Sequence, residues 1–177
     1  KEKIHKAIIL PIAPYISNEF VYNICKEYPD KFIGFASINP LEKNAPEKLE
    51  KIISKYNLKG LKLHPRLQGF RPNDKKIFKL YKKVEELGIP IIFDTIMSKR
   101  FPIKYQEPML YDDVAKLIPE TPIILAHFGG FKFYDAFIIA AINENIYFDT
   151  SVTLIYFHKT IFQDHIKFIF EKIGYDR

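Results

Sequence analysis

Short apolar runs alternate along the chain with longer segments in which apolar residues recur at helical spacing. Apolar runs that end at proline or glycine are typical of strands buried on both faces of a sheet. Strands are therefore predicted over residues 6–12, 31–40, 60–65, 89–95, 122–127 and 146–151. The segments between these runs predict helices, because their apolar residues fall on one face at a period of about 3.6 residues.

Capping residues mark several helix boundaries. Ser17 and Asn44 stand where a helix would begin, and Pro46 suits the first turn of the second helix. The clearest helix opens at Asn73-Asp74 and ends at Gly88, a residue suited to the left-handed backbone that follows a helix. Further helices are predicted over residues 111–118, 131–143 and 162–173. The predicted buried residues of the first helix are Phe20, Val21, Ile24 and Tyr28.

The alternation of strand and helix repeats roughly every 25 to 32 residues, which is the length of one βα unit. It predicts an α/β fold in which helices cover a parallel sheet. No break in composition marks a linker, so a single domain is predicted over residues 1–177. An open, doubly wound sheet would show the same alternation, although no strand-to-helix turn carries a glycine-rich phosphate loop. The non-periodic residues 96–108 predict a long functional loop.

Charge and composition narrow the classes of partner. The net charge is +6, but the lysines are diluted by acidic residues on predicted helix faces. Without an arginine cluster or a nucleic-acid-binding motif this indicates a solvated surface, and we expect no nucleic-acid partner. A single cysteine, Cys25, excludes an internal disulfide and suits a reducing compartment. No apolar run approaches the roughly 20 residues that cross a bilayer, so we expect a cytoplasmic protein without a membrane partner.

Polar residues stand at the ends of four predicted strands. Alternation places Lys62 and His64 on one face of their strand, and Asp94, His127 and Asp149 stand near the ends of later strands. Because the C-terminal ends of parallel strands meet at one rim, we expect these side chains to converge on a common ligand. Structural roles are the alternative: His127 could bond a loop carbonyl, Asp94 could cap a turn, and Asp149 could satisfy backbone amides.

The strand sequences carry a further signal. Residues 60–65 (GLKLHP) and 124–130 (ILAHFGG) are its most specific parts, and residues 89–93 and 147–151 accompany them in order. With these segments nearly the whole chain resembles the amidohydrolase superfamily. Within that superfamily it is similar to the amidohydrolase-related branch of metal-dependent hydrolases and decarboxylases, which includes aminocarboxymuconate-semialdehyde decarboxylase.

This resemblance implies a TIM (β/α)8-type barrel with a divalent metal, often zinc, at its C-terminal rim. The predicted strands would be the second to the seventh, so the first and last strands of the barrel would be missing from this chain. The family's metal ligands are a His-x-His on the first strand, a His on the fifth and an Asp on the eighth. Here Asp94 occupies the fifth-strand position, and no His-x-His occurs. We expect either a trimmed portion of a longer protein or a metal-free relative.

The resemblance also implies a hydrolase or decarboxylase that acts on a small acidic substrate. His127 would be the general acid or base, His64 a second catalytic residue, and Asp94 the metal ligand. The candidates for holding the substrate are Lys62, Lys99, Arg100 and Asp149. The alternative is a degenerate barrel that binds a ligand or partner without catalysis, which the missing ligand motifs would favour. A homo-oligomer is a further expectation, because an incomplete barrel leaves strand edges exposed.

Overall fold

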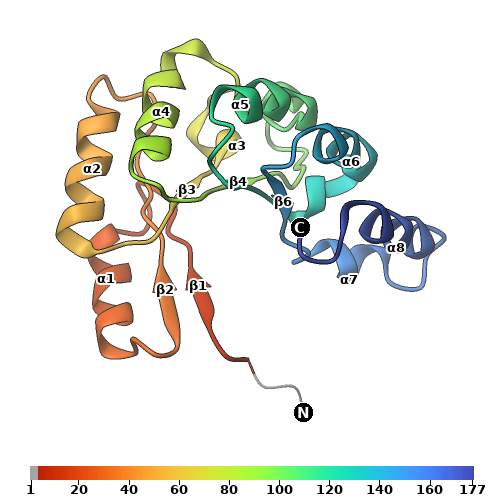
Figure 1. Ribbon diagram of the computed structural model, residues 1–177, viewed down its shortest axis with the longest axis horizontal. Helices are drawn as coiled ribbons and strands as arrows, with labels where there is room; N and C mark the ends of the chain where they lie inside the picture. The colour runs from red at the N-terminus through yellow and green to blue at the C-terminus, as the bar shows by residue number, and fades with distance from the viewer. Residues whose placement is uncertain (1–3) are drawn as a thin grey trace.

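The computed structural model describes residues 4–177 and arranges six short strands around an open arc (Figure 1). All strand pairs are parallel and follow the order of the sequence. β1 (Ala7–Ile9) pairs with β2 (Phe32–Gly34), and the four-stranded sheet consists of β3 (Leu61–Leu63), β4 (Ile91–Asp94), β5 (Ile123–Ala126) and β6 (Ile146–Phe148). The predicted parallel, sequential sheet is confirmed, and the described residues do not show the reversed strand order of a doubly wound sheet.

The two sheets meet at a seam between β2 and β3. A single parallel bridge joins Ala36 to Leu61 there. The amide of Ala36 donates to the carbonyl of Gly60, and the amide of Lys62 donates to the carbonyl of Ala36, both at 2.7 Å. Gly60 packs so closely on Phe35 that a Cβ at this position would lie 2.4 Å from its ring. A short parallel pairing and the close packing of the Phe35 ring on Gly60 therefore hold the seam together.

Most helices cover the outer side of the arc, whereas the strands line its inner side (Figure 1). The α-helices are α1 (Asn18–Glu27), α2 (Ala45–Tyr56), α3 (Pro65–Gln68), α4 (Phe78–Glu86), α5 (Tyr111–Leu117), α6 (Phe133–Ile142), α7 (Thr153–Phe157) and α8 (Phe162–Ile173). Short 3₁₀ turns are η1 (Lys75–Ile77), η2 (Ile103–Tyr105), η3 (Pro108–Leu110) and η4 (His127–Lys132). This is the order of a TIM (β/α)8-type barrel, of which the described residues form an incomplete part.

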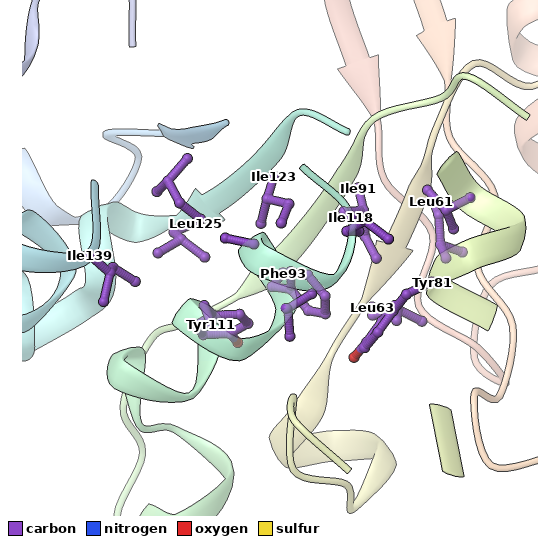
Figure 2. Packing of buried hydrophobic residues seen from close by; sticks show 14 of the residues in the cluster. Leu61, Leu63, Tyr81, Ile91, Phe93, Tyr111, Ile118, Ile123, Leu125 and Ile139 are labelled. Carbon is purple, nitrogen blue, oxygen red and sulfur yellow. The ribbon is translucent and has the colours of Figure 1, made fainter. Parts of the chain in front are cut away.

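The main core lies between the sheet and the helices. Its strand residues alternate along β3, β4 and β5 and are fully buried, as Figure 2 shows: Leu61, Leu63, Ile91, Phe93, Ile123 and Leu125. Tyr81 of α4 and Tyr111 of α5 pack on Phe93, with ring centroids 5.9 and 4.9 Å from its ring. The intervening residues, among them Lys62 and Ile92, face the inside of the arc. β3 and β4 are therefore buried on both faces.

The first βα unit is less buried than the sequence predicts. Ile8 of β1 is exposed because β1 has a partner on one edge only within the described residues. Ser17 caps α1 as predicted, and its Oγ accepts from the amide of Phe20 at 3.1 Å. Val21 is buried, but Phe20 and Tyr28 are exposed, contrary to prediction. α1 packs chiefly against β2 and α2, so much of its apolar surface has no neighbour to cover it.

Some local boundaries also differ from the predicted ones. The helix predicted from Asn73-Asp74 begins with η1, where Oδ1 of Asp74 accepts from the amide of Lys76 at 3.0 Å, and α4 proper starts at Phe78. α3 and α7 are not predicted, because helices of four and five residues are too short to show a period. Within residues 4–177, no helix has the length and apolar composition needed to cross a membrane.

Replacing Phe93 should test the position of the core. Phe93 is 0% exposed, so Phe93→Ala should lower the free energy of unfolding by about 3–5 kcal/mol, the cost of emptying a buried aromatic site. Phe20 is 56% exposed, so Phe20→Ala should change it by no more than about 0.5 kcal/mol. Urea denaturation followed by circular dichroism measures both. Equal losses would contradict the assigned exposure of α1.

Candidate active site

The carboxylate of Asp94 lies buried at the C-terminal end of β4. Its Oδ1 accepts a hydrogen bond from Nε of Arg66 at 3.0 Å. Its Oδ2 lies 3.2 Å from Nε2 of His127, in hydrogen-bonding geometry, and 3.2 Å from Nε2 of His64. One buried carboxylate thus meets three nitrogen-bearing side chains, which come from the ends of two neighbouring strands.

The end of β3 brings three basic groups toward Asp94. Lys62 lies in β3, and His64 follows it on the same, inner side of the strand. α3 begins directly after His64, so the chain turns and carries Arg66 to the carboxylate. The guanidinium of Arg66 also lies 5.5 Å from the ring centroid of Phe101, in the loop after β4. Arg66 is therefore fixed between a carboxylate and an aromatic ring.

His127 leaves β5 through a run of left-handed backbone. The angle φ is positive at four consecutive residues: His127 (63°), Phe128 (53°), Gly129 (74°) and Gly130 (62°). A Cβ on Gly129 would lie 2.4 Å from that of Ala136 in α6, and a Cβ on Gly130 would lie 2.9 Å from the carbonyl oxygen of Thr95. Positive φ is unfavourable at the two non-glycine residues, and such strain is concentrated at functional sites.

This turn also decides the direction of the His127 side chain. Strand alternation gives His127 the same parity as Leu125, whose side chain is buried on the helix side of the sheet. The positive φ of His127 breaks the alternation, and its ring instead reaches Asp94 on the inner side. The structure thus brings His64, Asp94 and His127 together, and for His127 it does so against the strand alternation.

Both ring nitrogens of His127 face oxygen acceptors. Nε2 faces Oδ2 of Asp94, and Nδ1 lies 3.2 Å from the carbonyl oxygen of Ser151 and 3.0 Å from its Oγ. A carboxylate and a carbonyl oxygen only accept hydrogen bonds, so the contacts with Asp94 and with the Ser151 carbonyl both form in the doubly protonated ring, whereas the Ser151 hydroxyl can also donate to a neutral Nδ1. The hydrogen bond to Asp94 raises the pKa of His127, although burial opposes this. The site therefore favours the imidazolium form.

Burial shifts the other titratable groups of the cluster. It lowers the pKa of His64 to about 4, although Asp94 opposes the shift, so the His64 ring is neutral near pH 7. It also lowers the pKa of Lys62, against the attraction of Asp94 and Asp149. Burial by itself would raise the pKa of Asp94, but the hydrogen bond from His127 and the neighbouring basic groups hold it at about 2. Asp94 is therefore an anion throughout the physiological range.

Two buried polar groups of the cluster lack a protein partner. Lys62 is only 4% exposed, and its ammonium makes no hydrogen bond or ion pair within residues 4–177. Nδ1 of His64 is also buried without a hydrogen-bond partner in the same part of the chain. Because nearly all buried polar groups in folded proteins are paired, unpaired ones at a rim indicate a place for a ligand or for water. Both groups are candidates for ligand contacts.

A pocket of about 470 Å³ opens beside α3. Its polar lining consists of Ser17, Asn18, Ser37, Asn39, Glu42, Lys48 and Gln68. Gln68 connects this pocket to the cluster, because its Oε1 accepts from the amide of His64 at 2.8 Å and its Nε2 donates to the carbonyl of Ile38 at 2.7 Å. The lining does not include Asp94 or His127, so the pocket adjoins the cluster and does not enclose it.

The other predicted substrate-binding residues are placed differently. Lys99 and Arg100 are exposed in the loop after β4, and neither contacts Asp94 in the described part of the chain. Asp149 follows β6, and its Oδ1 accepts from the amide of Ser151 at 2.6 Å. Asp149 thus binds a backbone amide, which is the structural role that the sequence indicated as the alternative to ligand binding. Roles for these three residues in substrate binding stay predictions.

Arg66 and Ser151 are contacts of the cluster that the sequence does not reveal. Arg66 stands two residues after His64, and a basic residue just beyond His-Pro would be a usable signal once α3 is known. Ser151 carries no such signal, because its contact with His127 depends on the paths of two separate turns. Arg66 contacts Asp94 and Ser151 contacts His127, and both contacted residues were predicted from their positions at strand ends.

The donor atoms around Asp94 do not by themselves fit a divalent metal ion. No group of three or more histidine, cysteine, aspartate or glutamate side chains within residues 4–177 could hold one. Stable catalytic zinc sites use about three protein ligands. Both oxygens of Asp94 already face nitrogen atoms, and one of these belongs to Arg66, which cannot lose its proton. As a predicted metal ligand, Asp94 thus has no partner ligands in the described residues.

Comparison with known protein families identifies the family to which this chain belongs. The family model described as amidohydrolase matches residues 7–177, nearly the whole chain. The chain belongs to the amidohydrolase family. The resemblance predicted from residues 60–65 and 124–130 is thereby confirmed. The same two segments contribute His64 and His127 to the Asp94 cluster.

Individual relatives of the chain are distant. The 2-amino-3-carboxymuconate-6-semialdehyde decarboxylase of Dictyostelium discoideum is 23% identical over 141 residues, which are 68% of this chain and 38% of that protein. An uncharacterised TIM-barrel protein of Bordetella bronchiseptica has a TM-score of 0.76 at 22% identity, covering 93% of this chain and 59% of its own. The 5-carboxyvanillate decarboxylase of Novosphingobium aromaticivorans, solved with manganese and 4-hydroxy-3-methoxy-5-nitrobenzoic acid, has a TM-score of 0.68 at 15% identity.

The carboxyvanillate decarboxylase match covers 98% of this chain and 64% of that protein. The chain therefore spans less than two thirds of the length of each of these three proteins. At these identities the two solved structures establish the fold alone, and they agree with the incomplete TIM barrel described above.

Gly129→Ala should destabilise the protein more than Gly69→Ala. Their φ angles are 74° and 71°, so alanine costs about 1–2 kcal/mol of backbone strain at either position. At Gly129 the new Cβ would also lie 2.4 Å from that of Ala136, whereas no atom lies within 4 Å at Gly69. We expect a further loss of about 1–3 kcal/mol at Gly129, measured by urea denaturation. Equal losses would contradict the close approach of the His127 turn to α6.

Asp94→Asn should lower the pKa of His127, because an amide has no charge to stabilise the imidazolium. A folded-state pKa raised above the ordinary 6.5 stabilises the fold fully below pH 6.5, and this stabilisation is lost as pH rises through the folded value. NMR titration of the histidine ring protons should show the lowered pKa at His127. An unchanged His127 titration would mean that Asp94 does not set its charge.

Proposed function

We propose that this chain supplies part of the active site of a hydrolase or decarboxylase of the amidohydrolase type, and specifically of a decarboxylase acting on a small aromatic or unsaturated acid. The observation that carries this proposal is the Asp94 cluster, in which the carboxylate contacts the His127 ring and raises its pKa. Two of the relatives named above are decarboxylases, which supports the reaction class. A barrel that only binds a ligand would have no need of such a proton donor.

The acidic group of the substrate would meet Lys62. This buried ammonium has no partner within residues 4–177, and a carboxylate would supply both the charge and the hydrogen-bond acceptors that it lacks. Arg66 stands beside it as a second cation, held by Asp94. The unpaired Nδ1 of His64 could accept a hydrogen bond from a substrate hydroxyl, since its neutral ring keeps one lone pair. Lys99, Arg100 and Asp149 remain proposed outer contacts.

His127 would provide the proton that decarboxylation requires. Breaking the bond between the substrate carbon and its carboxylate leaves both electrons on the carbon, and carbon dioxide departs. The imidazolium proton of His127 then passes to that carbon, and solvent protonates the ring again. Asp94 orients the ring and favours its charged form. Hydrolysis would instead use His127 as a base toward water.

The family resemblance implies a divalent metal, often zinc. Only the similarity to metal-binding relatives supports such a metal here. The carboxyvanillate decarboxylase was solved with manganese, and a bound ion in such an enzyme supplies electrostatic stabilisation of developing negative charge. The side chains around Asp94 do not fit an ion by themselves. The steps proposed here therefore use only the basic side chains and Asp94. We also propose a cytoplasmic location, a homo-oligomer and the absence of a nucleic-acid partner.

Turnover by the protein should depend on His127. Carbon dioxide release from small aromatic and unsaturated acids, 5-carboxyvanillate among them, should be detectable, and His127→Gln should lower kcat by about 10²- to 10⁴-fold. His158→Gln is the matched control, because His158 is exposed, and it should leave kcat within about twofold. Far-UV circular dichroism checks the folding of both variants. Undiminished turnover in His127→Gln would refute the proposed proton donor.

A further inference from the structure

We infer that the acidic group of the ligand at this site is held by two organic cations, Lys62 and Arg66, and not by a divalent metal ion bound to Asp94. For the class of ligand, a small carboxylic acid, this inference rests on the proposed function. Asp94 then serves as the counter-ion that positions the cations. It does so at the strand position where the family resemblance implies a metal-binding histidine.

Asp94 offers no free oxygen to an ion. Arg66 donates to Oδ1 at 3.0 Å, and the Nε2 atoms of His64 and His127 both lie 3.2 Å from Oδ2. The ring of Phe101 holds the guanidinium of Arg66 from a second side. A metal ion at Asp94 would have to displace one of these nitrogens and leave it buried without its partner, which is strongly unfavourable.

The charges around Asp94 repel a further cation and attract an anion. Arg66 is permanently charged, and Lys62 faces the same inner side of the sheet. The second carboxylate near Lys62 belongs to Asp149, and the amide of Ser151 already binds it at 2.6 Å. A divalent ion would gather three positive centres around one buried carboxylate. An anion would instead give Lys62 an ion-pair partner and would add a second carboxylate contact to Arg66, which already pairs with Asp94.

Lys62 indicates where the anion binds. Its side chain is more than nine-tenths buried, and within residues 4–177 its ammonium has no partner. The neighbour of Lys62 in the sheet register is Ile92, which packs with Phe35 and Ala126 into a small apolar cluster. A buried ammonium beside such an apolar wall suits a carboxylate carried on an apolar or aromatic body.

The test compares the wild-type protein with the variants Arg66→Gln and Asp94→Asn. The control variant is Arg71→Gln, because Arg71 is exposed. The probe is 4-hydroxy-3-methoxy-5-nitrobenzoic acid, whose nitrophenol absorbance reports binding. Each protein is titrated once in excess EDTA and once with added manganese chloride. Manganese and zinc contents after dialysis are measured separately by elemental analysis.

We expect the wild-type Kd in EDTA and in manganese to agree within about twofold. Arg66→Gln should weaken binding by about tenfold or more in both conditions, because it removes a charged donor, and Arg71→Gln should change it by less than about twofold. Asp94→Asn should leave the metal content of the protein unchanged. The EDTA comparison uses the wild-type protein alone, so it decides the question even where a variant fails to fold.

Two results would overturn the inference and leave the proposed function standing. One is a wild-type Kd that weakens by about tenfold or more in EDTA. The other is a stoichiometric metal that Asp94→Asn loses and Arg66→Gln retains. Failure of the wild-type protein to bind the probe in both conditions is a different outcome. It would refute the proposed class of substrate, and the assignment of Lys62 and Arg66 would fall with it.

Discussion

Burying the carboxylate of Asp94 is the constraint on which this rim depends. A carboxylate taken out of water is destabilising by several kcal/mol unless hydrogen-bond donors replace the lost hydration. Here the donors come from the neighbouring units, Arg66 after β3 and His127 after β5, and the ring of His64 lies against the same carboxylate. Their meeting at one carboxylate ties together the ends of β3, β4 and β5. The contacts that stabilise the rim are therefore the same ones that place the candidate catalytic groups.

The backbone after β5 is strained so that His127 can take part in this arrangement. Phe128 and His127 both have positive φ, and nearby contacts compensate for it. The amide of Phe128 donates to the carbonyl of Asp149 at 2.8 Å, and the hydroxyl of Thr153 donates to the carbonyl of His127. A turn held from two sides in this way leaves the His127 ring little freedom, which suits a group that must deliver a proton to one atom.

Sequence patterns predict the sheet of this protein better than its site, and the reason is physical. Strand order and direction follow from apolar runs that alternate with helical periods, signals that are summed over many residues. His64, Asp94 and His127 could be named because polar residues at strand ends stand out against those runs. The direction of His127 could not, because one φ angle sets it, and the contact of Arg66 requires a helix of only four residues. The exposure of Phe20 depends on which neighbours cover α1.

The seam between β2 and β3 gives the two parts of the sheet different local stability. Within residues 4–177 a single bridge pairs strands across it, supported by hydrogen bonds from Lys59 to Gly34 and from Gln68 to Ile38, so this short pairing is where the unit β1–α1–β2 would open first. Amide hydrogens of β1 and β2 would then exchange with solvent faster than those of β4 and β5. The Asp94 cluster draws its groups from the slower part and would persist through such openings. The pocket beside α3 is lined from both sides of the seam, at Ser37 and Gln68. Its width would therefore change whenever the seam opens or closes.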